Sequence, residues 1–111
     1  MNWNKLEHIS QIEKIKADSM NQPIVIFKHS TRCSISALVW DRLNRNWKNE
    51  DNKRVTPYYL DLITYREVSN LIAKEFGIMH QSPQVIIVKD GLATYDNSHM
   101  GISYQDIINQ L

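Results

Sequence analysis

The chain has 111 residues and a mass of 13.0 kDa, which fits one domain and is too short for two. Thirteen Lys and Arg residues against twelve Asp and Glu residues leave a net charge of +1, so no strong field attracts nucleic acid or an anionic membrane. The longest apolar runs have four residues, whereas a transmembrane helix needs about 20, and the N-terminus lacks the apolar core of a secretory signal. We therefore expect one globular domain, residues 1–111, in the cytoplasm.

The first predicted elements are a helix and a buried strand. Residues 4–17 are predicted as a helix because apolar residues recur every three positions, and Asn4 with Glu7 resembles a capping box. Pro23 ends this pattern. The run Ile24–Phe27 is apolar and mostly β-branched, which is typical of a strand buried on both faces.

A second helix, a second strand and a third helix follow a polar turn. The apolar face of the second helix consists of Ile35, Leu38, Val39 and Leu43. Val55–Leu62 is predicted as a strand, and Pro57 predicts that it lies at an edge of the sheet, because proline cannot donate a ladder hydrogen bond. Residues 64–76 form the third helix, with a capping box made by Thr64 and Glu67.

The C-terminal part is predicted as a hairpin and a last helix. Gln84–Val88 and Leu92–Tyr95 are extended runs joined by Asp90-Gly91, a strong signal for a tight hairpin turn. Ser103–Leu111 then reads as a short amphipathic helix.

The resulting element order is α-β-α-β-α-β-β-α. The β-α-β part requires a right-handed parallel crossover, and the hairpin adds an antiparallel pair. A four-stranded mixed sheet with helices on both faces accommodates this order. The sequence therefore predicts an α/β domain with the element order of the thioredoxin fold.

Cys33 is the only cysteine, which excludes an intramolecular disulfide, a dithiol C-x-x-C enzyme acting alone and a four-cysteine zinc site. It follows the predicted buried strand and begins a helix, where unpaired backbone N–H groups and the helix dipole favour a thiolate. Lys28, His29 and Arg32 add positive charge nearby. The thiol is therefore a candidate nucleophile, and an inert, buried cysteine is the alternative.

Two short patterns accompany this cysteine. Cys33 begins a C-x-x-S pattern in which Ser36 can donate a hydrogen bond to the sulfur; alternatively, Ser34 and Ser36 only occupy the first helical turn, where hydroxyls are common. Ser82-Pro83 precedes a predicted strand, at the place where a thioredoxin-like fold has a cis-proline that faces the active cysteine. We therefore expect a cis bond here, the alternative being a plain proline at the start of a strand.

Four segments form a joint pattern: Phe27–Ser36 (FKHSTRCSIS), Leu60–Asp61, His80–Val85 (HQSPQV) and Ser98–His99. Together they resemble the monothiol bacilliredoxin family of the bacillithiol system, over nearly the whole chain. The resemblance implies a thioredoxin fold, Cys33 as the redox nucleophile and removal of bacillithiol from protein mixed disulfides. Ser34 stands where the family frequently has proline, which would fix the first helical turn.

These observations define a set of expected site residues and partners. The site residues are Cys33 and Ser36 as the catalytic pair, Arg32, Ser34, Ser82 and Pro83 as substrate-binding residues, and His29 and His80 as tuning residues. Bacillithiol is the expected co-substrate, with no tightly bound cofactor and no metal. The expected partners of a monomer are S-bacillithiolated proteins and a resolving thiol or reductase. An iron–sulfur protein like the monothiol glutaredoxins, and a non-catalytic thioredoxin-like adaptor, remain as alternative functions.

Overall fold

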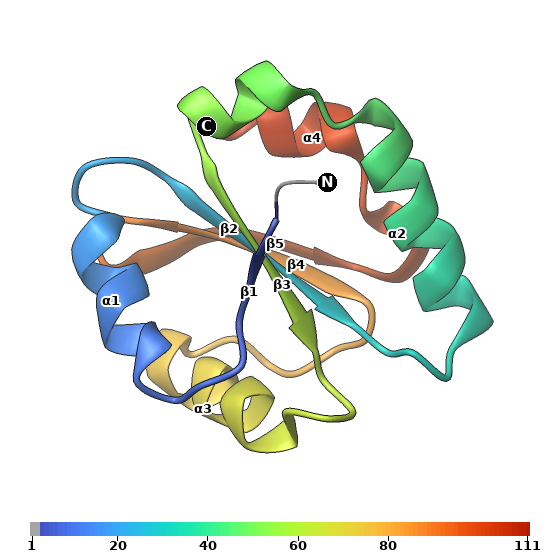
Figure 1. Cartoon of the computed structure of the whole chain (residues 1–111), viewed down its shortest axis with the longest axis horizontal. Helices are drawn as coiled ribbons and strands as arrows, with labels where there is room; N and C mark the ends of the chain where they lie inside the picture. Colours follow the sequence, from blue (N-terminus) through green and yellow to red (C-terminus); the bar gives the residue numbers. More distant parts are fainter. Residues whose placement is uncertain (1–2) are drawn as a thin grey trace.

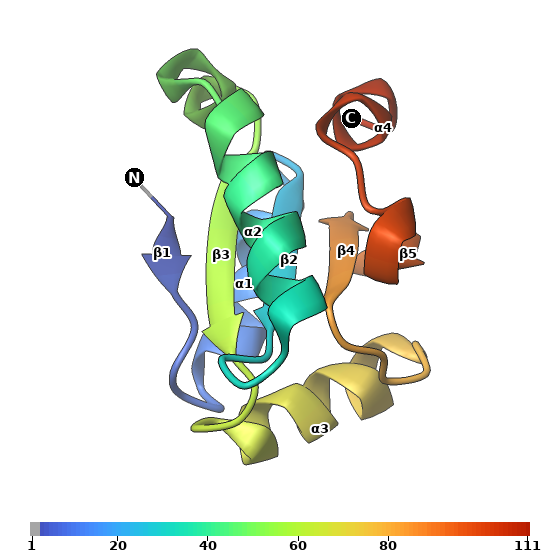
Figure 2. The ribbon, with the colours of Figure 1, turned by 90° about the vertical axis from the view of Figure 1, so that its right-hand side faces the viewer.

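The computed structural model describes residues 3–111, which build one mixed sheet between two layers of helices (Figures 1 and 2). The strand order is β1-β3-β2-β4-β5; β1, β3 and β2 are parallel, whereas β4 and β5 are antiparallel to their neighbours. The strands are β1 (Asn4–Lys5), β2 (Ile24–His29), β3 (Thr56–Asp61), β4 (Gln84–Lys89) and β5 (Leu92–Ser98). The helices are α1 (Gln11–Asp18), α2 (Ser34–Asn46), α3 (Arg66–Phe76) and α4 (Tyr104–Asn109), with 3-10 turns η1 (Asn49–Lys53) and η2 (His99–Gly101).

Both faces of the sheet are covered, because side chains of successive strand residues point to opposite faces. In β2, Ile24 and Ile26 join the core that α1 and α3 close, whereas Val25 and Phe27 join the core under α2 and α4. Figure 1 shows α1 and α3 on one side of the sheet and α2 and α4 on the other. The apolar runs of β2 and β4 are buried throughout, as expected for central strands.

The predicted helix over residues 4–17 is wrong in its first half. Asn4–Lys5 forms a fifth strand, so the sheet has five strands instead of four, and α1 begins only at Gln11. The capping box does not form, because the Asn4 side chain donates to the Pro57 carbonyl (3.1 Å) and Glu7 accepts from the Tyr65 hydroxyl (3.0 Å). The Gln11 side chain accepts from the N–H groups of residues 7 and 8 instead.

The predicted edge position of the Pro57 strand is also wrong, because β3 pairs with β2 on one side and β1 on the other. The Pro57 carbonyl points towards β1, and the N–H group that proline lacks would point the same way. Pairing with β1 begins one residue later, at Tyr58, so this missing donor falls outside the ladder. Proline is therefore tolerated in an interior strand whose neighbour is only two residues long.

Two helix details differ from the expectation. In α2, Val39 and Leu43 are buried, but Ile35 and Leu38 are 48% and 51% exposed. At α3 no capping box forms, because the Asp61 carboxylate accepts from the hydroxyl and N–H group of Thr64. The helix consequently begins at Arg66, two residues later than predicted.

The C-terminal predictions are confirmed. Asp90 and Gly91 both have positive φ angles, 52° and 78°, which is the geometry of a tight hairpin turn, and β5 lies at the edge of the sheet. The last helix, α4, is capped by Ser103, whose hydroxyl accepts from the N–H group of Asp106.

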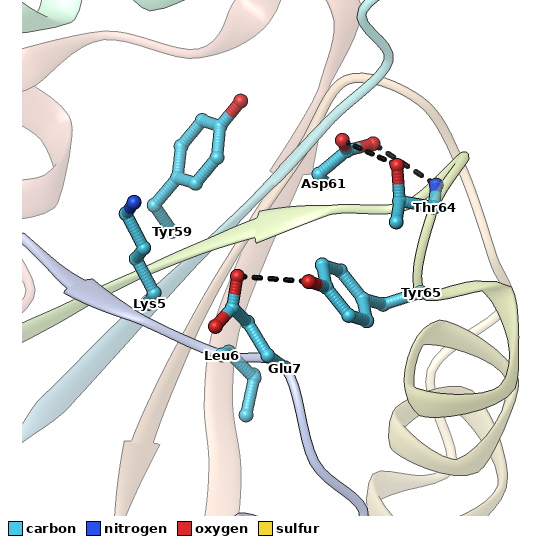
Figure 3. A pocket seen from close by; sticks show the side chains of 7 residues that line it. All are labelled: Lys5, Leu6, Glu7, Tyr59, Asp61, Thr64 and Tyr65. Atoms are coloured by element: carbon cyan, nitrogen blue, oxygen red, sulfur yellow. Dashed lines mark hydrogen bonds between the residues drawn. The ribbon is translucent and has the colours of Figure 1, made fainter.

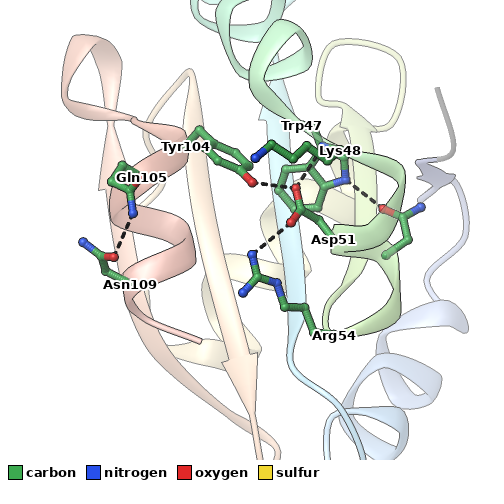
Figure 4. A network of polar contacts seen from close by, with 8 residues as sticks. Trp47, Lys48, Asp51, Arg54, Tyr104, Gln105 and Asn109 are labelled. Carbon is green, nitrogen blue, oxygen red and sulfur yellow. Dashed lines mark hydrogen bonds and ion pairs between the residues drawn. The ribbon is translucent and has the colours of Figure 1, made fainter.

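At the far end of α2, a buried carboxylate joins η1 to α4 (Figure 4). Asp51 accepts from the Lys48 N–H group (2.9 Å), the Tyr104 hydroxyl (2.7 Å) and Arg54 (3.0 Å). Burial favours the neutral acid, but these hydrogen bonds outweigh it and lower the pKa of Asp51. The network fastens the end of α2 and so helps to hold the helix that carries Cys33 at its other end.

Candidate active site

Cys33 lies at the N-cap position of α2, directly after the turn that follows β2, as predicted. Its backbone is extended, its N–H group donates to the Ser30 carbonyl (3.2 Å), and its own carbonyl accepts from Ala37 (3.1 Å). The residue is partly exposed, so its thiol is not sealed in the core. The position joins a nucleophilic side chain to a helix N-terminus, whose unpaired N–H groups favour a negative charge.

The Ser36 hydroxyl is fully buried and bonds to the preceding turn. It accepts from the Ser30 N–H group (3.0 Å) and lies 2.8 Å from Nδ1 of His29. Within residues 3–111, none of this hydroxyl's hydrogen bonds goes to Cys33. Burial lowers the pKa of His29, and the charge of Asp61 partly opposes this shift. The neutral ring can therefore accept a hydrogen bond from the Ser36 hydroxyl. Ser36 therefore ties the end of β2 to the first turn of α2.

Lys28 is a residue that the sequence analysis noted only for its charge. Its side chain is 0% exposed, on the face of β2 opposite His29. The ammonium group donates to the Ser69 carbonyl of α3 (3.2 Å) and lies 3.3 Å from Nδ1 of His80. Burial, and then the charge of Arg66, lower the pKa of Lys28 to about 8. A lysine that ends an apolar run is the signal in the sequence that could have revealed this contact.

His80 reaches the same place from the segment between α3 and β4. Nδ1 of the ring lies 3.4 Å from the Ser69 hydroxyl as well as near Lys28. Burial, Lys28 and Arg66 all lower the pKa of His80, so the neutral ring is favoured and Nδ1 can accept from the Lys28 ammonium. The ring is half-buried, at the border between the interior and the surface.

The Ser82-Pro83 bond is cis, as predicted. Because β4 runs antiparallel to β2, the start of β4 lies beside the end of β2, and the segment with Pro83 shares one end of the sheet with the turn before Cys33 (Figures 1 and 2). The Ser82 hydroxyl is buried and has no hydrogen-bond partner among residues 3–111. Gln84, which the sequence analysis missed, is buried and donates to the Met79 carbonyl (3.0 Å).

The other predicted binding residues, Arg32 and Ser34, are exposed on either side of Cys33. A hollow of about 260 Å³ lies at the same end of the sheet, between the ends of β1 and β3 (Figure 3). Neither Cys33 nor any other predicted site residue lines it. Its lining consists of Lys5, Leu6, Glu7, Tyr59, Asp61, Thr64 and Tyr65.

Residues 3–111 contain neither a cluster of metal-binding side chains nor a membrane-spanning helix. No group of three or more His, Cys, Asp and Glu side chains is arranged to hold a metal ion. No helix in the described part of the chain is long and apolar enough to cross a membrane.

The strand order, the cis-proline and the cysteine at a helix N-terminus define a thioredoxin-fold protein with a single thiol. Similar solved structures have this fold. One that is described as having a thioredoxin fold is 28% identical, with a TM-score of 0.80 and coverage of 96% of this chain and 91% of that one. The thioredoxin of Fasciola hepatica is 14% identical, with a TM-score of 0.70 and coverage of 96% and 93%. The thioredoxin of Malassezia sympodialis is 14% identical, with a TM-score of 0.74 and coverage of 97% of this chain and 86% of that one.

The family model described as monothiol bacilliredoxin BrxC matches residues 4–107, and the chain belongs to this family. The family and the fold support a role as a thiol oxidoreductase. The single cysteine agrees with the monothiol character of the family.

Proposed function

We propose that this protein removes bacillithiol from mixed disulfides of cytoplasmic proteins, with Cys33 as the nucleophile. One observation carries the proposal: the only thiol of the chain is partly exposed at the N-terminus of α2, at the end of the sheet that also holds the cis-proline segment. Membership in the monothiol bacilliredoxin family supports bacillithiol as the thiol that is removed.

In the proposed reaction, the Cys33 thiolate attacks the bacillithiol sulfur of a protein mixed disulfide. A new S–S bond forms between Cys33 and bacillithiol while the old one breaks, and the target cysteine leaves as a thiolate that takes up a proton. Cys33 now carries bacillithiol. A thiol from another molecule then attacks the bacillithiol sulfur, because the chain has no other cysteine. A disulfide forms between that thiol and bacillithiol, and Cys33 leaves as a thiolate. The resolving thiol or reductase is therefore a required partner.

The surrounding residues have supporting roles in this proposal. Ser36 and His29 hold the turn that presents Cys33, and the free N–H groups of the helix start stabilise the thiolate. Arg32 and Ser34, the exposed neighbours of Cys33 in the sequence, would contact the incoming disulfide. Ser82 and Pro83, whose cis bond exposes the backbone of the preceding residue, would bind the backbone of the target.

Intact-mass analysis tests the reaction. The reduced protein is mixed with a cysteine-containing protein that carries bacillithiol, and in parallel with one that carries glutathione. We expect Cys33 to gain the mass of bacillithiol while the target loses it, more slowly or not at all with glutathione. The Cys33→Ser variant is the control and should gain nothing. Transfer to this variant, or an unmodified wild-type protein, would refute the proposal and favour the adaptor.

A further inference from the structure

Lys28 is an unusual side chain for the interior of a sheet. Lysine is almost never fully buried without a charged partner, yet Lys28 has 0% exposure and its two bonding partners are a carbonyl group and a neutral imidazole. The charge that acts on it most is that of Arg66, which is of the same sign. Burying an ammonium group in this way is costly, whereas an apolar residue like the adjacent Leu60 of β3 would be cheap.

The contacts of Lys28 join three parts of the chain. Its own strand, β2, leads to Cys33 five residues later. The Ser69 carbonyl belongs to α3, and His80 belongs to the segment that connects α3 to β4. Because these partners are 41 and 52 residues away in sequence, the ammonium group acts as a tertiary cross-link and not as a local cap.

The segment that His80 belongs to ends in Ser82-Pro83. It is held a second time by Gln84, which lies opposite Lys28 in the β2–β4 ladder. The Gln84 side chain donates to the Met79 carbonyl (3.0 Å) and accepts from the Gln81 N–H group (3.4 Å). Gln84 thus holds the residues on both sides of His80, and Lys28 holds the His80 ring.

We propose that Lys28 is a positioning residue for thiol exchange: its ammonium group holds the segment from His80 to Pro83 at a fixed place relative to Cys33. This inference rests on the proposed function, since it assigns that segment to the alignment of the mixed disulfide for attack. Lys28 acts through His80 and touches no reacting atom.

The test uses Lys28→Met, which keeps an unbranched side chain only one atom shorter than lysine and removes the ammonium donors. The control is Lys74→Met on the exposed surface of α3. Hydrogen–deuterium exchange first measures the amides of residues 79–82. We expect exchange there to be about tenfold faster in Lys28→Met, equal to about 1.4 kcal/mol, with no change in β5 or in the control. Equal exchange in wild type and Lys28→Met would overturn the proposal.

Two rate constants then separate positioning from an effect on the thiolate. Lys28→Met should slow transfer of bacillithiol from the protein mixed disulfide about tenfold, while alkylation of Cys33 by iodoacetamide changes less than about twofold. If both rates fall together, Lys28 acts on the reactivity of Cys33 and the positioning role is wrong. If the wild-type protein takes up no bacillithiol, the proposed function fails and the alignment role fails with it, even where exchange shows that Lys28 holds the segment.

A second variant guards against loss of folding. His80→Ala breaks the same contact from the half-buried side, so it does not empty the core around Lys28. It should reproduce the faster exchange of residues 79–82. The double variant should show less than the sum of the two effects, because both changes remove one interaction. Additive effects would contradict a shared contact.

Discussion

The Ser36 hydroxyl fastens the turn before Cys33. It accepts from the Ser30 N–H group and contacts His29, and all three groups are buried. A C-x-x-S pattern alone suggests a bond from the serine to the sulfur, but the partner of a hydroxyl is decided by what the fold brings nearest. Here the end of β2 is nearest, so Ser36 acts on Cys33 through the geometry of the turn.

Replacing Ser36 by Ala should therefore lower stability as well as activity. The change leaves His29 and the Ser30 N–H group buried without their partner, at a cost of about 1–3 kcal/mol. Urea unfolding measures this cost, and Ser34→Ala, at an exposed position, is the stability control. Thiol–disulfide exchange by the Ser36→Ala protein should be slower than in the wild type but still present. A Ser36→Ala protein of wild-type stability would show that the hydroxyl does not hold the turn.

Cys33 itself should alkylate faster at pH 7 in the folded protein than in the same protein unfolded in denaturant. The reason is the start of α2, where the interaction of a negative charge with the helix end is worth about 0.3–2 kcal/mol. Iodoacetamide rates followed by intact mass give the comparison, with free cysteine in both buffers correcting for the denaturant. A folded protein that reacts more slowly than the unfolded one would instead indicate an inert thiol.

At the scale of elements, α3 shows how a helix start can differ from its sequence signature. Thr64 and Glu67 have the spacing of a capping box, but the Thr64 hydroxyl donates to Asp61. The N-cap residue of α3 is Tyr65, and its side chain makes no capping hydrogen bond. Asp61 ends β3 and accepts three hydrogen bonds from residues 63 and 64. The carboxylate at the strand end therefore shapes the turn into α3.

Asp61→Ala should destabilise the protein by about 1–2 kcal/mol, whereas Glu67→Ala should cost less than about 1 kcal/mol. Burial favours the neutral form of Asp61, but the bonds from Thr64 and Ile63 outweigh it and lower its pKa. The stabilisation is therefore present above the usual pKa of an aspartate and is lost as the pH falls below it. Urea unfolding at pH 7 and in acid measures both effects. A larger loss of stability from Glu67→Ala than from Asp61→Ala would indicate that the capping box forms after all.

At the scale of the whole molecule, buried or half-buried basic groups lie on both sides of the sheet, at the end of β2 that leads to Cys33. His29 faces the α2 side, and Lys28 faces the α3 side together with His80. Burial is the largest cause that lowers the pKa of each. The interior therefore favours their neutral forms, and stability should depend on pH through them.

Lys28 gives the sharpest form of this dependence. Its pKa is about 8 in the folded protein and 10.5 when unperturbed. Between these values the unfolded state binds more protons, so the contribution of Lys28 to the free energy of unfolding rises with pH; below about pH 8 its burial cost is fully present. The difference between the two pKa values corresponds to a change of about 3 kcal/mol in the free energy of unfolding. Urea unfolding of wild type and Lys28→Met from pH 7 to pH 10.5 should show the wild type gaining relative to the variant. A difference in the free energy of unfolding that stays constant over this pH range would contradict the lowered pKa of Lys28.

The sequence by itself determined the features that depend on local patterns. The apolar runs of β2 and β4, the Asp90-Gly91 turn and the start of α2 at Cys33 need no distant partner to be recognised, since each follows from hydrophobicity or turn geometry over a few residues. From these elements the order of the thioredoxin fold followed.

Only the tertiary structure decided the features that need a partner far along the chain. Asn4–Lys5 becomes a strand because β3 offers it an edge, and this same pairing makes the Pro57 strand an interior one. Ile35 and Leu38 remain exposed because no element of the described chain covers that face of α2. Lys28 contacts His80 only when α3 and β4 have packed against β2. Long-range pairing and burial are properties of the assembled fold, which a local pattern of residues does not contain.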